Sequence, residues 1–273
     1  MFFSQEQMSE PRLVGFAGGA IAIFSSACPG SPEPNEDGAL LLPFSEQEAV
    51  LAVADGAGGQ PAGAEAAAAA LGALRHAVDS ARTQGRSLRG GILDGFEAGH
   101  RAVRDLGVGA ATTLAAVEIG PGYLRPYHAG DSSIVVVGQR GRAKLTTIPH
   151  SPVGYAVEAG LLEREEALHH EDLNYVSNVL GEEGMRIEVG SALALAPRDT
   201  AILATDGVFD NLRLGEVADY VRTGPLARAS ASLYEACAQR MNRAAAGQPS
   251  KPDDATFIPV SYTHLTLPTT PYV

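Results

Sequence analysis

The sequence predicts a single α+β domain, and three observations support this prediction. The chain has 273 residues, of which 45% are hydrophobic, so it is long enough for one large core. Short apolar segments bounded by Gly- and Pro-containing turns occur in two separate groups, which is typical of β-hairpins. Longer segments with helical spacing follow each group. Hairpins, helices, more hairpins, then helices and a last strand indicate an α+β domain.

The N-terminal part of this pattern contains a strand and a hairpin. Residues 1–12 are polar, and we expect them to be frayed. Residues 13–24 predict one strand, bent at its glycines. Residues 28–38 predict a loop, because they are rich in Pro, Gly and Asn. Two apolar segments at 39–43 and 49–54, separated by a polar turn, predict a hairpin.

Two helices and a group of strands follow. The alanine-rich segment 61–83 has high helix propensity. Ser87 is a candidate N-cap for a second helix that ends near Leu106. Glycine-containing turns then separate four short apolar segments, which predict an antiparallel meander. These segments are residues 112–119, 123–128, 133–137 and 143–148.

The C-terminal part predicts a polar flap and a closing set of elements. Residues 149–184 are polar and mixed, with a short helical piece at 163–169. The predicted elements after it are strands at 186–189, 200–204 and 256–260 and helices at 214–223 and 225–246. Residues 261–273 are rich in Thr and Pro, and we interpret them as a disordered or non-native tail. The predicted domain is therefore residues 1–260.

Composition excludes several classes of protein. The net charge is −12 and no basic stripe is present, so we expect no nucleic-acid partner. The longest nearly apolar segment, residues 14–24, is far shorter than the roughly 20 residues of a membrane-spanning helix, so we expect no membrane partner. The chain has only two cysteines, which favours a reducing, cytoplasmic compartment.

Two segments share one form, in which an apolar strand leads directly into Asp-Gly. They are V-L-A-V-A-D-G, ending at Asp55-Gly56, and A-I-L-A-T-D-G, ending at Asp206-Gly207. A buried strand holds such an aspartate rigidly at the rim of its sheet, and the glycine lets the backbone turn sharply there. Asp-Gly is also a common turn dipeptide, so one example alone would indicate only a turn.

Further carboxylates lie at other predicted strand ends. Glu36 and Asp37 precede one strand, Asp131 lies in a turn, and Asp253 and Asp254 precede the last strand. Oxygen ligands of this kind suit hard divalent cations. Zinc is less favoured, because the sequence has no Cys/His cluster with ligand spacing.

The order of these motifs resembles the bacterial type 2C, or PPM, family of metal-dependent serine/threonine protein phosphatases. The motifs are N-E-D (35–37), D-G-A-G-G (55–59), G-A-A-T-T (109–113), G-D-S (130–132), T-D-G-V-F-D-N (205–211) and D-D-A-T (253–256). The resemblance covers about residues 13–260 and includes the flap. It implies a four-layer αββα sandwich, in which two antiparallel sheets pack face to face between helices.

The resemblance also implies a site that holds two Mn²⁺ or Mg²⁺ ions and a third, weaker one. Asp55 would bridge the two ions, and the Gly56 carbonyl would bind one of them. Asp206 and Asp253 would bind the other, and Asp131 would bind the third. The carboxylates with catalytic roles would be Asp37, Asp55, Asp206 and Asp253.

The remaining implied contacts surround these ligands. Asp37, together with Glu36, would hold metal-bound waters, and the small Thr112 and Thr113 would pack beneath the cluster. His128, beside the Asp131 turn, is interpreted instead as a core histidine with a backbone partner.

The implied reaction is hydrolysis of phosphoserine and phosphothreonine by a metal-activated water. The substrate would be a phosphorylated protein, the product of a serine/threonine kinase, and we expect the phosphatase to be a monomer. Pro32, a departure from the family pattern, favours an alternative, a catalytically weak or inactive regulatory or binding module. Pro32 stands where bacterial members have an arginine that grips the phosphate, and Asp254 replaces an amide. Arg12, Arg125 and Arg213 are candidates to supply the phosphate contact.

Overall fold

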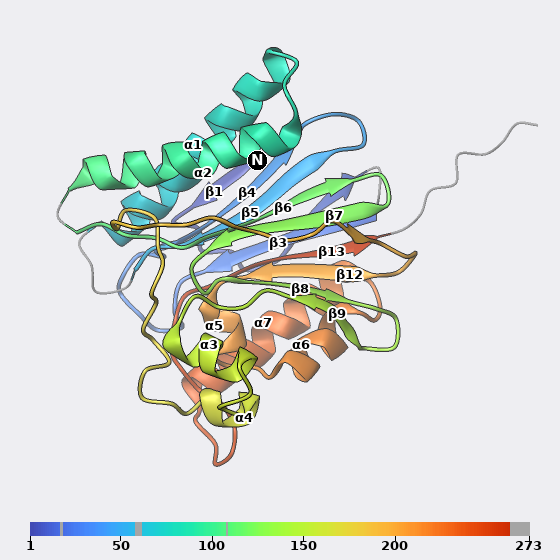
Figure 1. Ribbon diagram of the computed structural model, residues 1–273. Helices are drawn as coiled ribbons and strands as arrows, with labels where there is room; N and C mark the ends of the chain where they lie inside the picture. Colours follow the sequence, from blue (N-terminus) through green and yellow to red (C-terminus); the bar gives the residue numbers. More distant parts are fainter. Residues whose placement is uncertain (17–18, 58–61, 108, 263–273) are drawn as a thin grey trace, which may run out of the picture.

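The computed structural model describes residues 1–16, 19–57, 62–107 and 109–262. Two antiparallel sheets pack face to face, and helices cover the outer side of each (Figure 1). This arrangement confirms the α+β class and the four-layer sandwich implied by the resemblance.

The first sheet has the strand order β1-β4-β5-β6-β7-β10, with β11 also paired to β7. Its strands are β1 (Phe2–Ser4), β4 (Asp37–Pro43), β5 (Ala49–Asp55), β6 (Leu114–Gly120), β7 (Tyr123–Ala129), β10 (Glu188–Val189) and β11 (Leu193–Ala194). The second sheet has the order β2-β3-β13-β12-β8-β9. Its strands are β2 (Arg12–Phe16), β3 (Gly19–Ser26), β8 (Ser133–Val137), β9 (Ala143–Thr146), β12 (Thr200–Ala204) and β13 (Ala255–Tyr262).

Helices pack on both outer faces and beside the sheets. They are α1 (Gly63–Thr83), α2 (Leu88–Leu106), α3 (Pro152–Glu158), α4 (Arg164–Ala167), α5 (Asp206–Phe209), α6 (Leu214–Val221) and α7 (Leu226–Asn242). The helices α1 and α2 cover the first sheet, whereas α6 and α7 cover the second (Figure 1). The Ser87 hydroxyl accepts a hydrogen bond from the Gly90 N–H at 3.1 Å, which confirms its predicted role as the N-cap of α2.

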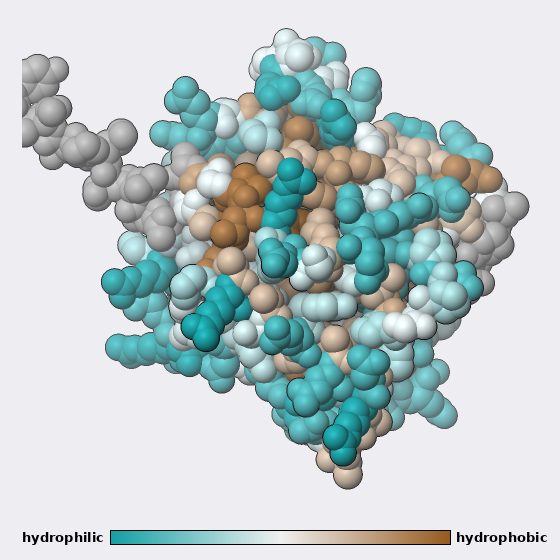
Figure 2. Space-filling model, turned by 180° about the vertical axis from the view of Figure 1, so that it is seen from behind, coloured by the Kyte–Doolittle hydropathy of each residue, from teal (hydrophilic) through white to brown (hydrophobic). Residues whose placement is uncertain are grey.

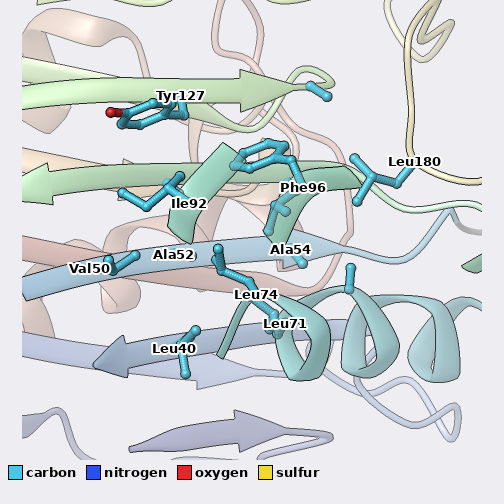
Figure 3. Close-up of a cluster of buried hydrophobic side chains, with 14 of the residues drawn as sticks. Leu40, Val50, Ala52, Ala54, Leu71, Leu74, Ile92, Phe96, Tyr127 and Leu180 are labelled. Carbon is cyan, nitrogen blue, oxygen red and sulfur yellow. The ribbon is translucent and has the colours of Figure 1, made fainter. Parts of the chain in front are cut away.

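Alternation of side chains along each strand builds three hydrophobic layers. In β5, Val50 and Ala52 face the helices, where they join Leu71 and Phe96 (Figure 3). Leu51, one position along, points to the opposite side and packs between the two sheets. This period of two is what an extended strand imposes. A strand that is buried on both faces is held firmly, so the residue at its end has a fixed position.

Two predictions for the N-terminal region are wrong. The segment 1–12 is not all frayed, since β1 pairs with β4 and the Phe3 side chain is buried. The segment 13–24 is not one bent strand but the antiparallel pair β2 and β3, in which Phe16 pairs with Gly19. The predicted bend is thus a full reversal of the chain, and its connection, residues 17–18, lies outside the described residues.

The predicted meander is also wrong, because its four strands belong to different sheets. The pair β6–β7 lies in the first sheet and the pair β8–β9 in the second. The chain therefore crosses between sheets at residues 130–132. Gly130 makes this crossing with φ 118°, and a Cβ atom there would lie 2.5 Å from Cβ of Thr113. Asp131 consequently lies where the two sheets meet at one end.

The C-terminal strand is longer than predicted. β13 continues to Tyr262, since Ser261 pairs with Thr200 and Tyr262 with Gly19. The remainder of the predicted tail, residues 263–273, lies outside the described residues.

In the described part of the chain, none of the helices combines the length and the hydropathy required to cross a bilayer. The face turned away from Figure 1 carries mostly hydrophilic residues, with hydrophobic ones between them (Figure 2).

Candidate metal centre

Asp37 and Asp55 lie opposite each other at one end of the first sheet. Asp37 begins β4, Asp55 ends β5, and the two are direct partners in the antiparallel register. The Glu36 carbonyl accepts a hydrogen bond from the Gly56 N–H at 3.2 Å, which continues the pairing beyond the strands. The two aspartates that the sequence placed at separate strand ends are thus neighbours by backbone pairing.

A hydrogen bond joins this pair to the second sheet. Thr205 follows β12 directly, and its hydroxyl donates to Oδ2 of Asp37 at 2.8 Å. Asp37 is buried, and its N–H donates to Oδ1 of Asn35 at 2.9 Å. Asp206, the next residue after Thr205, is thereby brought to the same end of the molecule as Asp37 and Asp55.

Two buried threonines hold the backbone of Asp55. The Thr112 hydroxyl and the Thr113 N–H donate to the Asp55 carbonyl at 2.8 and 2.9 Å, respectively. The Asp55 N–H donates to Oγ1 of Thr113 at 3.1 Å. Thr113 in turn shares a 2.7 Å hydrogen bond with Ser132, beside Asp131. The predicted position of the threonines beneath the carboxylates is confirmed.

The other side of the centre contains an ion-pair network. Lys251 Nζ contacts Oδ2 of Asp206, and it lies 3.0 Å from Oδ2 of both Asp210 and Asp253. Burial alone lowers the pKa of Lys251, but Asp206 and the other two carboxylates outweigh it and hold the pKa well above its usual range. The ammonium therefore stays charged among the acids.

The carboxylates, in contrast to the ammonium, are disfavoured in their charged form by burial and by mutual repulsion. Burial, then the charge of Asp37, raises the pKa of Asp55 well above its usual range; Asp206, Asp131 and Asp253 add to the effect. Burial, then Asp206, raises the pKa of Asp131 to about 7 and that of Asp253 to about 6. Carboxylates gathered from both sheets thus repel one another without a bound cation. An all-oxygen donor set of this kind fits Mn²⁺ or Mg²⁺.

Two glycines permit close backbone contacts around the centre. A Cβ atom on Gly56 would lie 2.2 Å from the carbonyl oxygen of Gly63, the first residue of α1. A Cβ atom on Gly207 would lie 1.8 Å from the carbonyl oxygen of Asp254. Both Asp-Gly pairs therefore need glycine for space, whereas the φ angles of Gly56 and Gly207 are not positive. The Glu36 carboxylate lies against Gly63, and burial, then the charges of Asp254 and Asp253, raises its pKa.

Sequence reasoning missed the roles of three residues. Asp210 belongs to the cluster, and its spacing of four from Asp206 on a helical turn was an available signal. Lys251 gave no signal, since two of its three partners, Asp206 and Asp210, are distant in sequence. Asp254 accepts hydrogen bonds from the N–H groups of Cys28 at 2.8 Å and Glu36 at 2.7 Å. Both ends of the predicted 28–38 loop are thus tied to the residue beside Asp253.

A second group, His128, His150 and Glu188, has possible ligand atoms within 4.8 Å of one another. Its hydrogen bonds argue against metal binding. Nδ1 of His150 accepts from the Gly130 N–H at 3.1 Å, so its proton lies on Nε2, which faces Glu188 at 3.1 Å. Nε2 of His128 donates to the Ile148 carbonyl at 3.0 Å, which confirms the predicted backbone partner. These histidines hold the flap against the Asp131 turn.

A cavity of about 250 Å³ lies between the aspartates and the flap. Asp131, Asp206 and Asp210 line one end, and apolar side chains such as Val153 and Leu168 line the flap side. Among the arginines considered above for phosphate binding, Arg213 lines this cavity, whereas Arg125 lies 4.0 Å from Glu118 and Arg12 lies over the Phe3 ring.

This fold occurs in bacterial serine/threonine phosphatases. The Mycobacterium tuberculosis phosphatase PstP aligns with a TM-score of 0.72 and 23% identity, over 89% of this chain and 98% of that one. The Streptococcus agalactiae serine/threonine phosphatase aligns with a TM-score of 0.71 and 24% identity, over 89% of this chain and 99% of that one. A PstP catalytic domain in complex with two manganese ions has a TM-score of 0.68 and 21% identity, over 89% and 98% of the two chains.

The sequence comparisons define the family. The family model described as protein phosphatase 2C matches residues 28–245. A Streptococcus pyogenes serotype M6 protein, named for the protein phosphatase 2C type, is 28% identical over 174 residues, which are 62% of this chain and 70% of that protein. The chain belongs to the protein phosphatase 2C family. Its enzyme class is therefore protein-serine/threonine phosphatase, and the metals of this class are Mn²⁺ and Mg²⁺.

The raised pKa values predict that Mn²⁺ affinity depends on pH. A cation bound by Asp131 and Asp253 would need both carboxylates ionised, so its binding would expel the protons that they hold near and below neutral pH. We expect affinity to fall from about pH 8 to about pH 6, by about tenfold per pH unit for each proton released. Calorimetric titration with Mn²⁺ at several pH values checks this, and Asp131→Asn should show a shallower dependence. An affinity that is constant over this range would rule out the expected proton release.

Proposed function

We propose that the chain hydrolyses phosphoserine and phosphothreonine in proteins, with divalent cations held by Asp55, Asp206 and Asp253. The observation that carries the proposal is the convergence of carboxylates from both sheets: Asp37 pairs with Asp55 in register and accepts a hydrogen bond from Thr205, which adjoins Asp206. When bound, two cations would acidify a water molecule and offset negative charge on the phosphoryl oxygens.

The chain's own residues would then divide the remaining work. Thr112 and Thr113 fix the Asp55 backbone through hydrogen bonds, so this carboxylate needs little rearrangement to bind a cation. Asp37, held by Thr205, is placed to accept hydrogen bonds from waters at the site, and we assign Glu36 a supporting role there. The proposal also assigns the Gly56 carbonyl to one of the paired ions and Asp131 to a weaker third.

The cavity beside the cluster supports a protein substrate. Its acidic end would hold the cations that attract a phosphate group, and its apolar walls suit the side chains of a peptide. We propose Arg213 as the cationic residue that takes the role absent at Pro32, because it lines this cavity and Pro32 is exposed. The substrate class that follows is a protein phosphorylated by a serine/threonine kinase. We also propose a cytoplasmic, monomeric enzyme.

The test is hydrolysis of an aryl phosphate and of a phosphothreonine peptide with Mn²⁺, with Mg²⁺ and with a chelator. We expect both substrates to be hydrolysed only when a divalent cation is present, and Arg213→Ala to raise KM for the peptide. A protein that binds Mn²⁺ but hydrolyses neither substrate would support the alternative, an inactive regulatory module. Hydrolysis that persists in chelator would reject the proposed role of the cations.

A further inference from the structure

Lys251 places a positive charge inside the proposed metal centre. Its Nζ atom contacts Asp206, and it lies 3.0 Å from one oxygen each of Asp210 and Asp253. Its side chain is 24% exposed, so solvent screens these contacts only in part. Two of its three partners, Asp206 and Asp253, are carboxylates assigned above to a divalent cation.

The backbone holds Lys251 in this position. The buried side chain of Asn211 accepts from the Lys251 N–H at 2.9 Å and donates to the Lys251 carbonyl at 2.7 Å. The same amide group donates to the Gly207 carbonyl at 2.9 Å. The hydrogen bonds of Asn211 therefore tie the Lys251 backbone to the turn that carries Asp206. They hold the lysine where its side chain reaches the cluster.

The ammonium and a divalent cation require the same oxygens. An ammonium group supplies one positive charge and donates hydrogen bonds, whereas Mn²⁺ supplies two charges and binds the carboxylate oxygen directly. A cation bound by Asp206 and Asp253 would lie close to the present position of Nζ, where the two like charges repel.

We propose that Lys251 is a built-in competitor of divalent cations: its ammonium occupies Asp206 and Asp253 in the metal-free protein and withdraws to Asp210 when a cation binds. This inference rests on the proposed function, which assigns Asp206 and Asp253 to a cation. Asp210 suits the withdrawn state, because it already contacts the ammonium and is partly buried in the same turn. The lysine thus stabilises the metal-free fold and lowers its metal affinity.

The first test compares Mn²⁺ binding by the full chain and by Lys251→Met, using calorimetry in the absence of substrate. We expect the variant to bind Mn²⁺ tighter by about tenfold or more, because a like charge beside the cation is removed. Its metal-free melting temperature should fall, and the rise on adding Mn²⁺ should exceed that of the parent. The matched control is Lys144→Met, since Lys144 pairs with Asp199, 2.6 Å away and outside the cluster; its Mn²⁺ affinity should be unchanged.

The second test needs no variant, so it holds even if Lys251→Met fails to fold. Lys144 and Lys251 are the only two lysines, and ¹⁵N-lysine labelling therefore gives two Nζ signals. Titration with Mg²⁺ should shift the Lys251 signal and leave that of Lys144 in place.

The outcomes distinguish a failure of the proposed competition from a failure of the proposed function. Equal or weaker Mn²⁺ binding by Lys251→Met, or a Lys251 signal that Mg²⁺ does not move although it binds, would overturn the competition. If Asp206→Asn instead bound Mn²⁺ and Mg²⁺ as tightly as the parent, the assignment of this carboxylate to a cation would be overturned. The proposed function depends on that assignment.

Discussion

Asp55→Asn and Asp206→Asn should each lower Mn²⁺-dependent turnover by more than about 100-fold, since even partners that only orient a metal ligand contribute about 10- to 100-fold. Asp55 is fixed by two threonines and faces Asp37 across the strand pair. An amide keeps this position but removes the charge that holds a cation. Hydrolysis of a phosphothreonine peptide at saturating Mn²⁺ is the measurement.

The same two variants should retain their fold. Burial and the neighbouring acids disfavour ionised Asp55 in the metal-free protein, as its raised pKa indicates. Replacing it with a neutral amide should therefore leave the metal-free melting temperature equal or higher. In Asp206→Asn, Lys251 keeps its contacts with Asp210 and Asp253. Asp94→Asn, on the exposed side of α2, is the control and should retain full activity. Near-normal turnover in either site variant would show that its aspartate is not a required ligand.

Gly207→Ala should lower the free energy of unfolding by about 3 kcal/mol, at the upper end of the usual cost of overpacking. Its Cβ atom would lie 1.8 Å from the backbone oxygen of Asp254 and 3.4 Å from Cβ of Asp253. The obstacle is backbone, so the segment that carries both aspartates must shift. Mn²⁺ affinity should fall together with stability. Urea denaturation and calorimetry measure the two effects.

The control for this variant is Gly72→Ala in α1. Apart from its chain neighbours and the nearby backbone of α1, no atom lies within 4 Å of the added Cβ, and alanine in place of a helical glycine should increase stability by up to about 1 kcal/mol. Mn²⁺ affinity should not change. If Gly207→Ala were as stable as the parent and bound Mn²⁺ normally, the close approach of α5 to residues 253–254 would not be a requirement of the site.

Local signals account for much of what the sequence predicted. The hairpin at 39–54 follows from two apolar segments around a polar turn, and the α2 N-cap follows from Ser87. The repeated Asp-Gly form located Asp55 and Asp206, because a strand buried on both faces must end at a defined residue. Each of these predictions depends on residues close together in the chain.

The errors arise where contacts between distant residues decide the structure. Strand patterns cannot state which sheet a hairpin joins, so the crossing between sheets at Asp131 was missed. β1 depends on a contact between distant residues, since Phe3 pairs with β4 and its side chain is buried there. Lys251 meets Asp206 across 45 positions of sequence, which no local pattern encodes. Asp254, interpreted as a loss of an amide, instead binds two backbone N–H groups of a distant loop.

The gathering of acids from both sheets has a kinetic consequence. With a net charge of −12 and a cavity that ends in three aspartates, the metal-free protein repels a phosphate dianion and attracts small cations by long-range electrostatic steering. We therefore expect cations to bind before the substrate. Salt screens both effects, so raising the ionic strength slows the capture of cations while it eases the approach of a phosphorylated protein.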